Sequence, residues 1–226
     1  MALNAAEEET VEELKKWWDE NGKQLAAMVI LVLAGYTGWL LWQNSNAEAM
    51  DTASDIYEQI LTLGIVDPGV EIGESVASEN SDRIIQLADQ LKSEHGGTVY
   101  ALFASLFSAQ QQVRANDLSA AESSLQWIID NQQDDFFGKT DEGLILTTNL
   151  RLGRVILAQG DNQRALGLVN TIDPKSFEAG YAELRGDIYA DMERYVDALD
   201  AYVTAQQAGS NSNSLRMKLD NLADEG

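Results

Sequence analysis

Few residues of this 226-residue chain belong to the types that carry out catalysis or bind metals. The sequence contains no cysteine and a single histidine, His95. Thiolate nucleophiles, disulfides and thiolate metal sites are therefore excluded. Gly96 and Gly97 follow His95 at an expected helix end, where a histidine most simply caps the last turn. The sequence also has no glycine-rich phosphate loop, nucleophile elbow or zinc-ligand spacing.

The most suggestive carboxylates are Glu183, Asp187 and Asp191, which follow one another at four-residue spacing. On a helix they would share one face. Paired carboxylates can perform acid–base catalysis when a pocket separates their pKa values. Charges at helical spacing more commonly form a solvated face. We therefore expect no enzyme activity, no cofactor, no metal and no small-molecule substrate.

The charge of the chain narrows the class of partner. Its formal net charge is -22, from 37 acidic and 15 basic residues. Such a surface repels phosphate groups, so neither nucleic-acid binding nor peripheral attachment to anionic lipids is expected. The acidity lies mainly after Trp42, where 30 acidic residues face 12 basic ones.

Residues 24–47 carry no charged side chain, and their apolar centre is residues 25–42. As a helix the uncharged stretch would be about 36 Å long, against about 30 Å for a hydrocarbon core. Tryptophans flank it at Trp17, Trp18, Trp39 and Trp42, as in an aromatic belt. The alternatives are a buried core helix and a cleavable signal peptide. The glutamate-rich N-terminus, the length and Trp42 favour a membrane span over a signal peptide.

Basic residues set the expected orientation. Lys15, Lys16 and Lys23 precede the span, and the next basic residue is Arg83. By the positive-inside rule the N-terminus is cytoplasmic. We expect a cytoplasmic arm at 1–24, a transmembrane helix at 25–43 and an exported helical domain at 44–226. Within the span, Ala34, Gly35 and Gly38 form a small-residue face on which another membrane helix could pack.

The exported part repeats itself. Asp117 is followed four residues later by Ala121, and Asp161 by Ala165; in a third unit Arg194 precedes Ala198 by the same distance. The interval from Ala165 to Ala198 is 33 residues, close to the 34-residue tetratricopeptide period of two helices per unit. The aspartates are expected to cap helices, and the alanines to lie at tight helix–helix contacts. A generic helical bundle is the alternative.

The remaining segments complete an all-α prediction: one N-terminal transmembrane helix followed by a tetratricopeptide-like helical-repeat solenoid. A first helix pair is expected from residues around Ala53–Leu63 and Ile84–Leu91. Pro68, Gly69 and Gly73 predict an acidic loop over residues 64–81. A second loop is expected at 131–138, and a last helix near Leu215.

Helical register nominates residues for a repeat groove. Gly153 and Gly186 are 33 residues apart and are expected to face partner helices. The positions that follow them would then point to the concave side. The resulting candidates for contact with a peptide or chaperone are Thr147, Arg154, Glu183, Asp187 and Asp191.

In its overall order of segments the chain resembles the YfgM-type ancillary subunits of the bacterial SecYEG translocon. The resemblance lies in residues 20–23 and 38–42 at the two ends of the span. It continues in the repeats, in residues 149–155 and 183–187. The loop at 64–81 is longer and more acidic than is usual in that family.

This resemblance implies a single-pass (type II) protein of the bacterial inner membrane with a periplasmic repeat domain. It also implies two partners, the SecYEG translocon and a periplasmic chaperone or folding factor such as PpiD. The implied role is to hand newly translocated proteins to periplasmic chaperones. The alternative is a membrane-tethered scaffold for envelope assembly or cell division without a translocon role.

Overall fold

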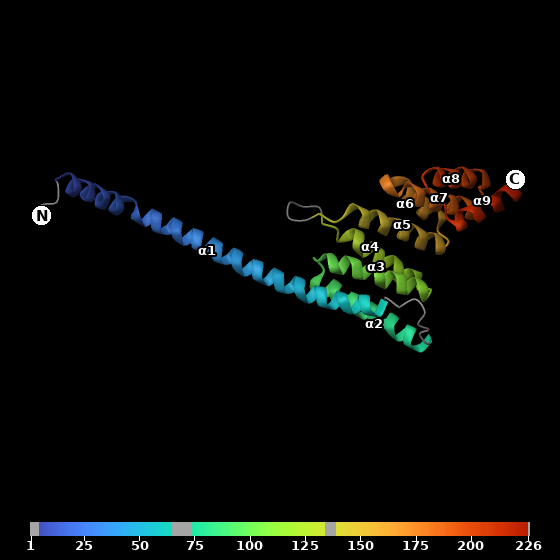
Figure 1. Cartoon of the computed structure of the whole chain (residues 1–226), viewed down its shortest axis with the longest axis horizontal. Coiled ribbons are helices and arrows are strands. Elements are labelled where there is room, and N and C mark those ends of the chain that lie inside the picture. Colours follow the sequence, from blue (N-terminus) through green and yellow to red (C-terminus); the bar gives the residue numbers. More distant parts are fainter. Residues whose placement is uncertain (1–4, 65–73, 134–138, 226) are drawn as a thin grey trace. The chain divides into compact units, whose positions relative to one another are not determined.

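The computed structural model describes residues 5–64, 74–133 and 139–225 (Figure 1). Within these residues it consists of nine α-helices and one short 3-10 helix, which confirms the all-α fold. In chain order they are α1 (Ala5–Gly64), α2 (Glu74–His95), α3 (Val99–Arg114), α4 (Leu118–Asp130), α5 (Glu142–Ala158), α6 (Asn162–Thr171), η1 (Lys175–Phe177), α7 (Glu178–Asp191), α8 (Tyr195–Gln207) and α9 (Asn213–Glu225).

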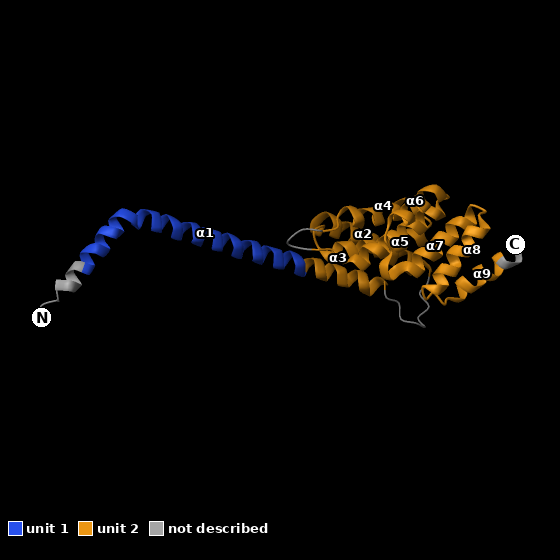
Figure 2. Cartoon of the chain, turned by 90° about the horizontal axis from the view of Figure 1, so that it is seen from above, with its two compact units in different colours: residues 1–51 blue, residues 52–226 orange. Residues whose placement is uncertain are grey.

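The chain divides into two compact units, residues 1–51 and residues 52–226 (Figure 2). In the first unit α1 exposes its apolar side chains on all sides, including Leu31, Val32 and Leu41. Within the described part of the chain, α1 is the one helix long and apolar enough to cross a membrane. The expectation that the helix continues past the apolar segment is confirmed, since α1 ends only at Gly64.

The second unit begins with the end of α1. Ala53, Ile56 and Ile60 are buried there in one cluster with Leu87 and Leu91 of α2, as the spacing predicts. Tyr57 lies beside this cluster and packs its ring against three aromatic rings of α3, those of Tyr100, Phe103 and Phe107.

One boundary prediction was wrong. The loop expected over 64–81 is too long, because α2 begins at Glu74. Residues 74–79 are exposed, so this start of α2 has no buried apolar face and no apolar periodicity that would predict a helix. The segment also lacks proline and glycine after Gly73, and Glu74 in the first turn suits the helix dipole. Residues 65–73 lie outside the described residues, as do residues 134–138 of the second expected loop.

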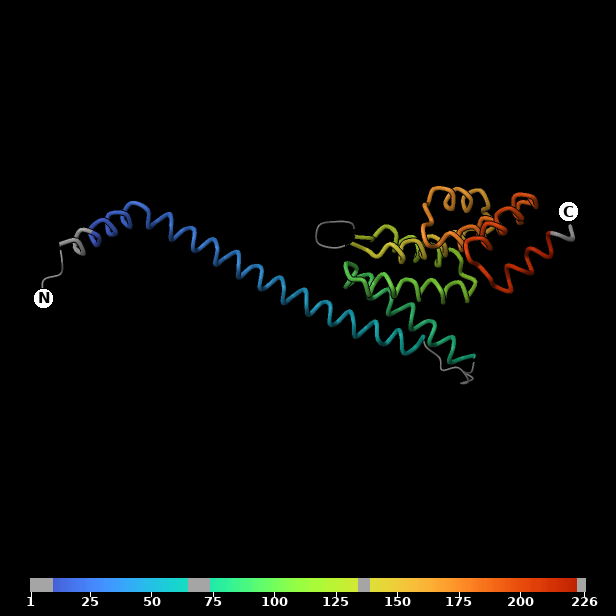
Figure 3. The backbone as a smooth tube through the Cα atoms, turned by 45° about the horizontal axis from the view of Figure 1, so that its top comes forward, coloured from blue at the N-terminus to red at the C-terminus, as the bar shows by residue number. Residues whose placement is uncertain are grey.

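From α3 onward the two helices of each pair are joined by one recurring turn. Asn116, Gly160 and Glu193 each adopt a positive φ, at 58°, 82° and 57°. In each turn the amide of the residue that follows donates a hydrogen bond to the carbonyl five positions earlier, as from Asp161 N to Ile156 O at 3.2 Å. This is the Schellman ending of a helix. It stops the first helix of each pair and lets the second fold back along it (Figure 3).

The predicted caps and small contacts are confirmed. Asp117 Oδ1 accepts a hydrogen bond from Ala120 N at 3.0 Å, and Asp161 Oδ1 accepts one from Arg164 N at 3.1 Å. Arg194, which cannot accept, makes no such cap. The three alanines that follow these positions, Ala121, Ala165 and Ala198, have no exposed surface. An alanine therefore lies at the contact between the two helices of each pair, where its small side chain lets the helices approach closely.

Candidate protein-binding surfaces

The first candidate surface is the small-residue face of α1, formed by Ala34, Gly35 and Gly38. All three residues are exposed. Apart from the helix's own backbone, no described atom lies within 4 Å of a Cβ built on either glycine. The neighbouring Thr37 hydroxyl donates within the helix, to Leu33 O at 2.7 Å. This face therefore offers close approach to the backbone and no unsatisfied side-chain donor, as a membrane helix contact requires.

The second candidate set lies on α7, where Glu183 and Asp187 meet the last helix. Lys218 of α9 places Nζ 2.9 Å from Glu183 Oε1 and 2.6 Å from Asp187 Oδ1. Tyr202 of α8 donates its hydroxyl hydrogen to Asp187 Oδ1 at 2.8 Å. All four side chains are largely shielded from solvent. The two predicted groove carboxylates are therefore partnered by side chains of this chain.

The pKa values of this cluster follow from its burial and charges. Burial raises the pKa of Tyr202, and the hydrogen bond to Asp187 raises it further. For Lys218 burial lowers the pKa, but the hydrogen bonds to Asp187 and Glu183 outweigh it and the net change is upward. At neutral pH the lysine is charged and pairs with both carboxylates, while the neutral tyrosine donates its hydroxyl hydrogen to Asp187.

The other α7 and α5 candidates lie elsewhere. Asp191 is exposed at the end of α7 and accepts a hydrogen bond from Asn162 Nδ2 of α6 at 2.7 Å. Thr147 is half-buried on α5, next to Leu146. Leu146 O accepts a hydrogen bond from the hydroxyl of Tyr181 at 2.8 Å, which links α5 to α7. Burial raises the pKa of Tyr181 to about 12.

Gly153 and Gly186 explain how α5 and α7 pack. A Cβ on Gly186 would lie 2.3 Å from Tyr202 Cε1, on the partner helix of its pair. A Cβ on Gly153 would meet Leu184 Cδ2 of the next repeat at 2.8 Å, and Val169 of its own pair at 3.6 Å. The expected contact within the pair is therefore closest for Gly186. At Gly153 the absence of a side chain mainly makes room for Leu184 of the neighbouring repeat.

Arg154, the remaining candidate, borders a groove between α3, α4 and α5. The groove has a volume of about 370 Å³. Its floor is apolar and combines residues that are far apart in sequence: Leu106, Ala109 and Val113 of α3, Leu118 and Leu125 of α4, and Val155 of α5. Within the described residues Arg154 shares no hydrogen bond or ion pair with Glu183, Asp187 or Asp191. The predicted groove residues thus do not form a single site.

Two further arginines border the same groove, Arg114 of α3 and Arg151 of α5. Sequence reasoning did not select them, although Arg151 lies one helical turn before Arg154. Lys218 was also missed, because its partners are 31 and 35 residues away in sequence. No local pattern signals contacts of this kind.

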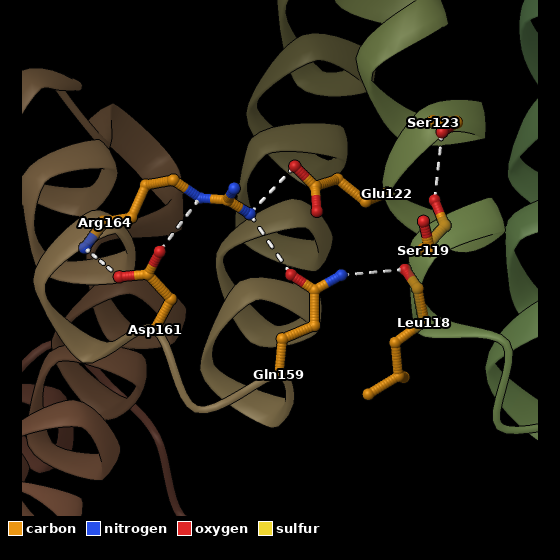
Figure 4. A network of polar contacts seen from close by, with 7 residues as sticks. All are labelled: Leu118, Ser119, Glu122, Ser123, Gln159, Asp161 and Arg164. Carbon is orange, nitrogen blue, oxygen red and sulfur yellow. Dashed lines mark hydrogen bonds and ion pairs between the residues drawn. The ribbon is translucent and has the colours of Figure 1, made fainter.

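Neighbouring repeats are also tied by a polar network at the α4–α5–α6 junction (Figure 4). Arg164 of α6 places Nη2 2.8 Å from Glu122 Oε1 of α4, and the same nitrogen donates to Gln159 Oε1 at 3.2 Å. Gln159 in turn donates to Leu118 O at 3.1 Å. The guanidinium of Arg164 therefore joins two repeats, whereas that of Arg154 forms no ion pair or hydrogen bond within the described residues.

Comparison with known proteins agrees with this architecture. The family described as tetratricopeptide repeat-like domain matches residues 15–224. The chain is 33% identical to the ancillary SecYEG translocon subunit of Haemophilus influenzae, over 98% of this chain and 100% of the relative. It is 30% identical to the protein of the same name from Escherichia coli, over 99% and 100% of the two chains. No solved structure matches it.

The family match includes the apolar part of α1 as well as every helix of the repeats. The two relatives are matched over their whole length, so the similarity extends across both the apolar part of α1 and the repeats of this chain. The chain therefore belongs to the tetratricopeptide repeat-like family that contains the ancillary SecYEG translocon subunits.

Proposed function

We propose that this chain is a non-catalytic adaptor of the protein-export machinery in the bacterial inner membrane. It associates with the SecYEG translocon and links newly translocated proteins to a periplasmic chaperone or folding factor of the PpiD kind. The observation that carries this proposal is the end-to-end similarity to ancillary SecYEG translocon subunits. A second support is the pairing of one exposed apolar helix with a repeat unit, because repeats offer extended protein-binding surfaces.

The two units would divide the work. Residues 25–43 span the membrane and use Ala34, Gly35 and Gly38 to pack against a helix of the translocon. The repeats bind the soluble partner. A tether of this kind can raise the effective concentration of a bound chaperone to about the millimolar range near emerging chains. Neither step requires a cofactor.

In the proposed orientation the N-terminus is cytoplasmic and residues 44–226 are periplasmic. Lys15, Lys16 and Lys23 before the span support it. External protease added to spheroplasts should then digest the repeat domain and spare the N-terminal arm. Protection of the repeat domain from the protease would contradict this orientation and indicate the opposite one.

The translocon role is tested by exchanging the membrane helix. Replacing residues 24–43 with an unrelated single span should leave the repeats folded and able to bind their soluble partner. Copurification with SecYEG from detergent-solubilised membranes should fall. Gly38→Leu and Ala34→Leu should each cause a smaller loss, because a leucine covers only part of the face.

A matched control is Leu40→Ala, which changes an exposed apolar residue on the side of the same helix that faces away from Ala34, Gly35 and Gly38. It should copurify as the parent does. If the protein with the exchanged helix copurifies with SecYEG as well as the parent does, the proposal that the membrane helix makes the contact is wrong. The repeats must then bind the translocon.

A further inference from the structure

We propose that the groove between α3, α4 and α5 binds an acidic, amphipathic segment of another protein. This proposal rests on the proposed role of the repeats in binding a protein partner, and it names the chemistry of that partner. The segment would insert apolar side chains into the groove and place carboxylates against the arginines Arg114, Arg151 and Arg154.

The floor of the groove supplies the apolar part of this recognition. Its volume of about 370 Å³ is within the range of pockets that enclose several side-chain-sized groups. Val113 contributes an exposed apolar surface, 44% accessible, while Leu125 closes the bottom and is 1% accessible. An apolar side chain placed here would remove Val113 from water as well as itself.

The three arginines supply the charge. Arg151 and Arg154 are exposed and, within the described residues, form no ion pair or side-chain hydrogen bond. Arg114 reaches only the neutral amide oxygen of Gln111, at 3.5 Å. Among the described residues that line the groove there is no aspartate or glutamate. The guanidinium groups are thus available to an external partner.

Five other basic residues of the second unit are paired within the chain. Lys92, Arg164, Lys175, Arg194 and Lys218 each form an ion pair with a carboxylate of this chain. Arg83 and Arg216 donate only to neutral side chains, but neither of them lines the groove. Three unpaired arginines around one apolar floor therefore form a positive site on an acidic protein, complementary to carboxylates.

The same features favour a protein segment over other anions. A nucleic acid or an anionic membrane presents many phosphates at once, and the net charge of -22 repels them. A short segment with two or three carboxylates meets the arginines without approaching the remaining surface. Arginine also binds carboxylates through two parallel hydrogen bonds, which fixes the direction of the segment.

The test is a selection of random twelve-residue peptides displayed on phage against the full chain in nanodiscs of zwitterionic lipid. Enriched sequences should combine aspartate or glutamate with large apolar residues. Their synthetic versions, followed by fluorescence anisotropy, should bind R151Q/R154Q about tenfold more weakly than the parent. Binding should also weaken from 0.1 M to 1 M salt, where the screening length falls from about 10 Å to about 3 Å.

The matched control is R83Q/R216Q, which removes two exposed arginines outside the groove. Within the described residues their side chains form hydrogen bonds only with the neutral Gln86 and Asn213, and neither forms an ion pair. This variant should bind as the parent does. Val113→Gln should weaken binding without changing the charge, which tests the floor separately.

Several results would overturn the proposal. They are the absence of enrichment, enrichment of peptides without carboxylates, or equal binding by the parent and R151Q/R154Q. Competition by oleate or by vesicles of anionic lipid, but not by the free acidic peptide, would assign the groove to a lipid instead. Self-association of the chain that depends on Arg151 and Arg154 would assign the groove to a second copy of this chain. Because no translocon is present, these outcomes are independent of the helix-exchange experiment.

Discussion

The ring of Tyr202 lies so close to Gly186 that a Cβ at this position would come within 2.3 Å of Cε1. The ring cannot easily move away. It is 3% exposed, and its hydroxyl is held by Asp187. The contact between α7 and α8 therefore depends on the absence of a side chain at residue 186.

Gly186→Ala should lower the free energy of unfolding. Overpacking a tight contact costs about 1–3 kcal/mol, whereas alanine gains about 0.5–1 kcal/mol over glycine within a helix. We expect a net loss of up to about 2 kcal/mol from these two effects. The control is Gly167→Ala in α6, where no atom lies within 4 Å of the added Cβ. Thermal unfolding of the full chain, followed by circular dichroism, should show opposite shifts for the two variants.

A second prediction concerns alkaline pH. The pKa of buried Tyr181 is raised to about 12, from an ordinary value near 10. A raised pKa means that the folded state holds the proton more tightly. This contribution to stability is complete below pH 10 and is lost as the pH rises from about 10 to 12. Tyr181→Phe cannot ionise, so its stability should fall less over this range than that of the parent.

At pH 7 Tyr181→Phe should lose about 1 kcal/mol, because it removes the hydrogen bond from the tyrosine hydroxyl to Leu146 O. Unfolding by urea at several pH values measures both effects. Tyr195→Phe is the control, since Tyr195 is exposed and lies outside this contact. Parallel pH profiles for the parent and Tyr181→Phe would show that the buried phenol does not contribute.

A third prediction concerns the attachment of α9. Lys218 bridges Glu183 and Asp187, so Lys218→Met leaves two partly buried carboxylates close together without a cation. We expect α9 to open locally, at a cost of about 1–2 kcal/mol after allowing for partial exposure. Hydrogen exchange should become faster in residues 213–222 and stay unchanged in α3 and α4. Arg216→Met, on an exposed residue of the same helix, should leave α9 protected.

A fourth prediction concerns the repeated alanines. Ala165 and Ala198 have no exposed surface, and each lies between the helices of a pair. Replacement of either by leucine should cost about 1–3 kcal/mol through overpacking. Ala77→Leu in α2 is the control, because Ala77 is exposed within a helix. If all three variants melt at the same temperature, the alanines do not determine the spacing of the helices.

The sequence alone was sufficient wherever the cause is local. A stretch of 24 residues without charge predicts a helix of membrane-spanning length, and α1 is long and apolar enough to be one. Asp117 and Asp161 cap helices because an acceptor beside a turn meets the free amides of the next helix, three residues on. The recurring alanines likewise mark helix pairs, since helical periodicity fixes which residues share a face.

Tertiary structure decided the partners of the site residues. Glu183 and Asp187 could have lined an open groove by their register, yet α9 folds back and brings Lys218 between them. Arg154 and Arg114 line the same groove only because residues of α3, α4 and α5 come together around it. These residues are 31 to 40 positions apart in sequence, and the periodicity of a single helix does not encode which of them come together. These arrangements arise from the summed packing of several helices, because each side chain is placed by the helices that bury its neighbours.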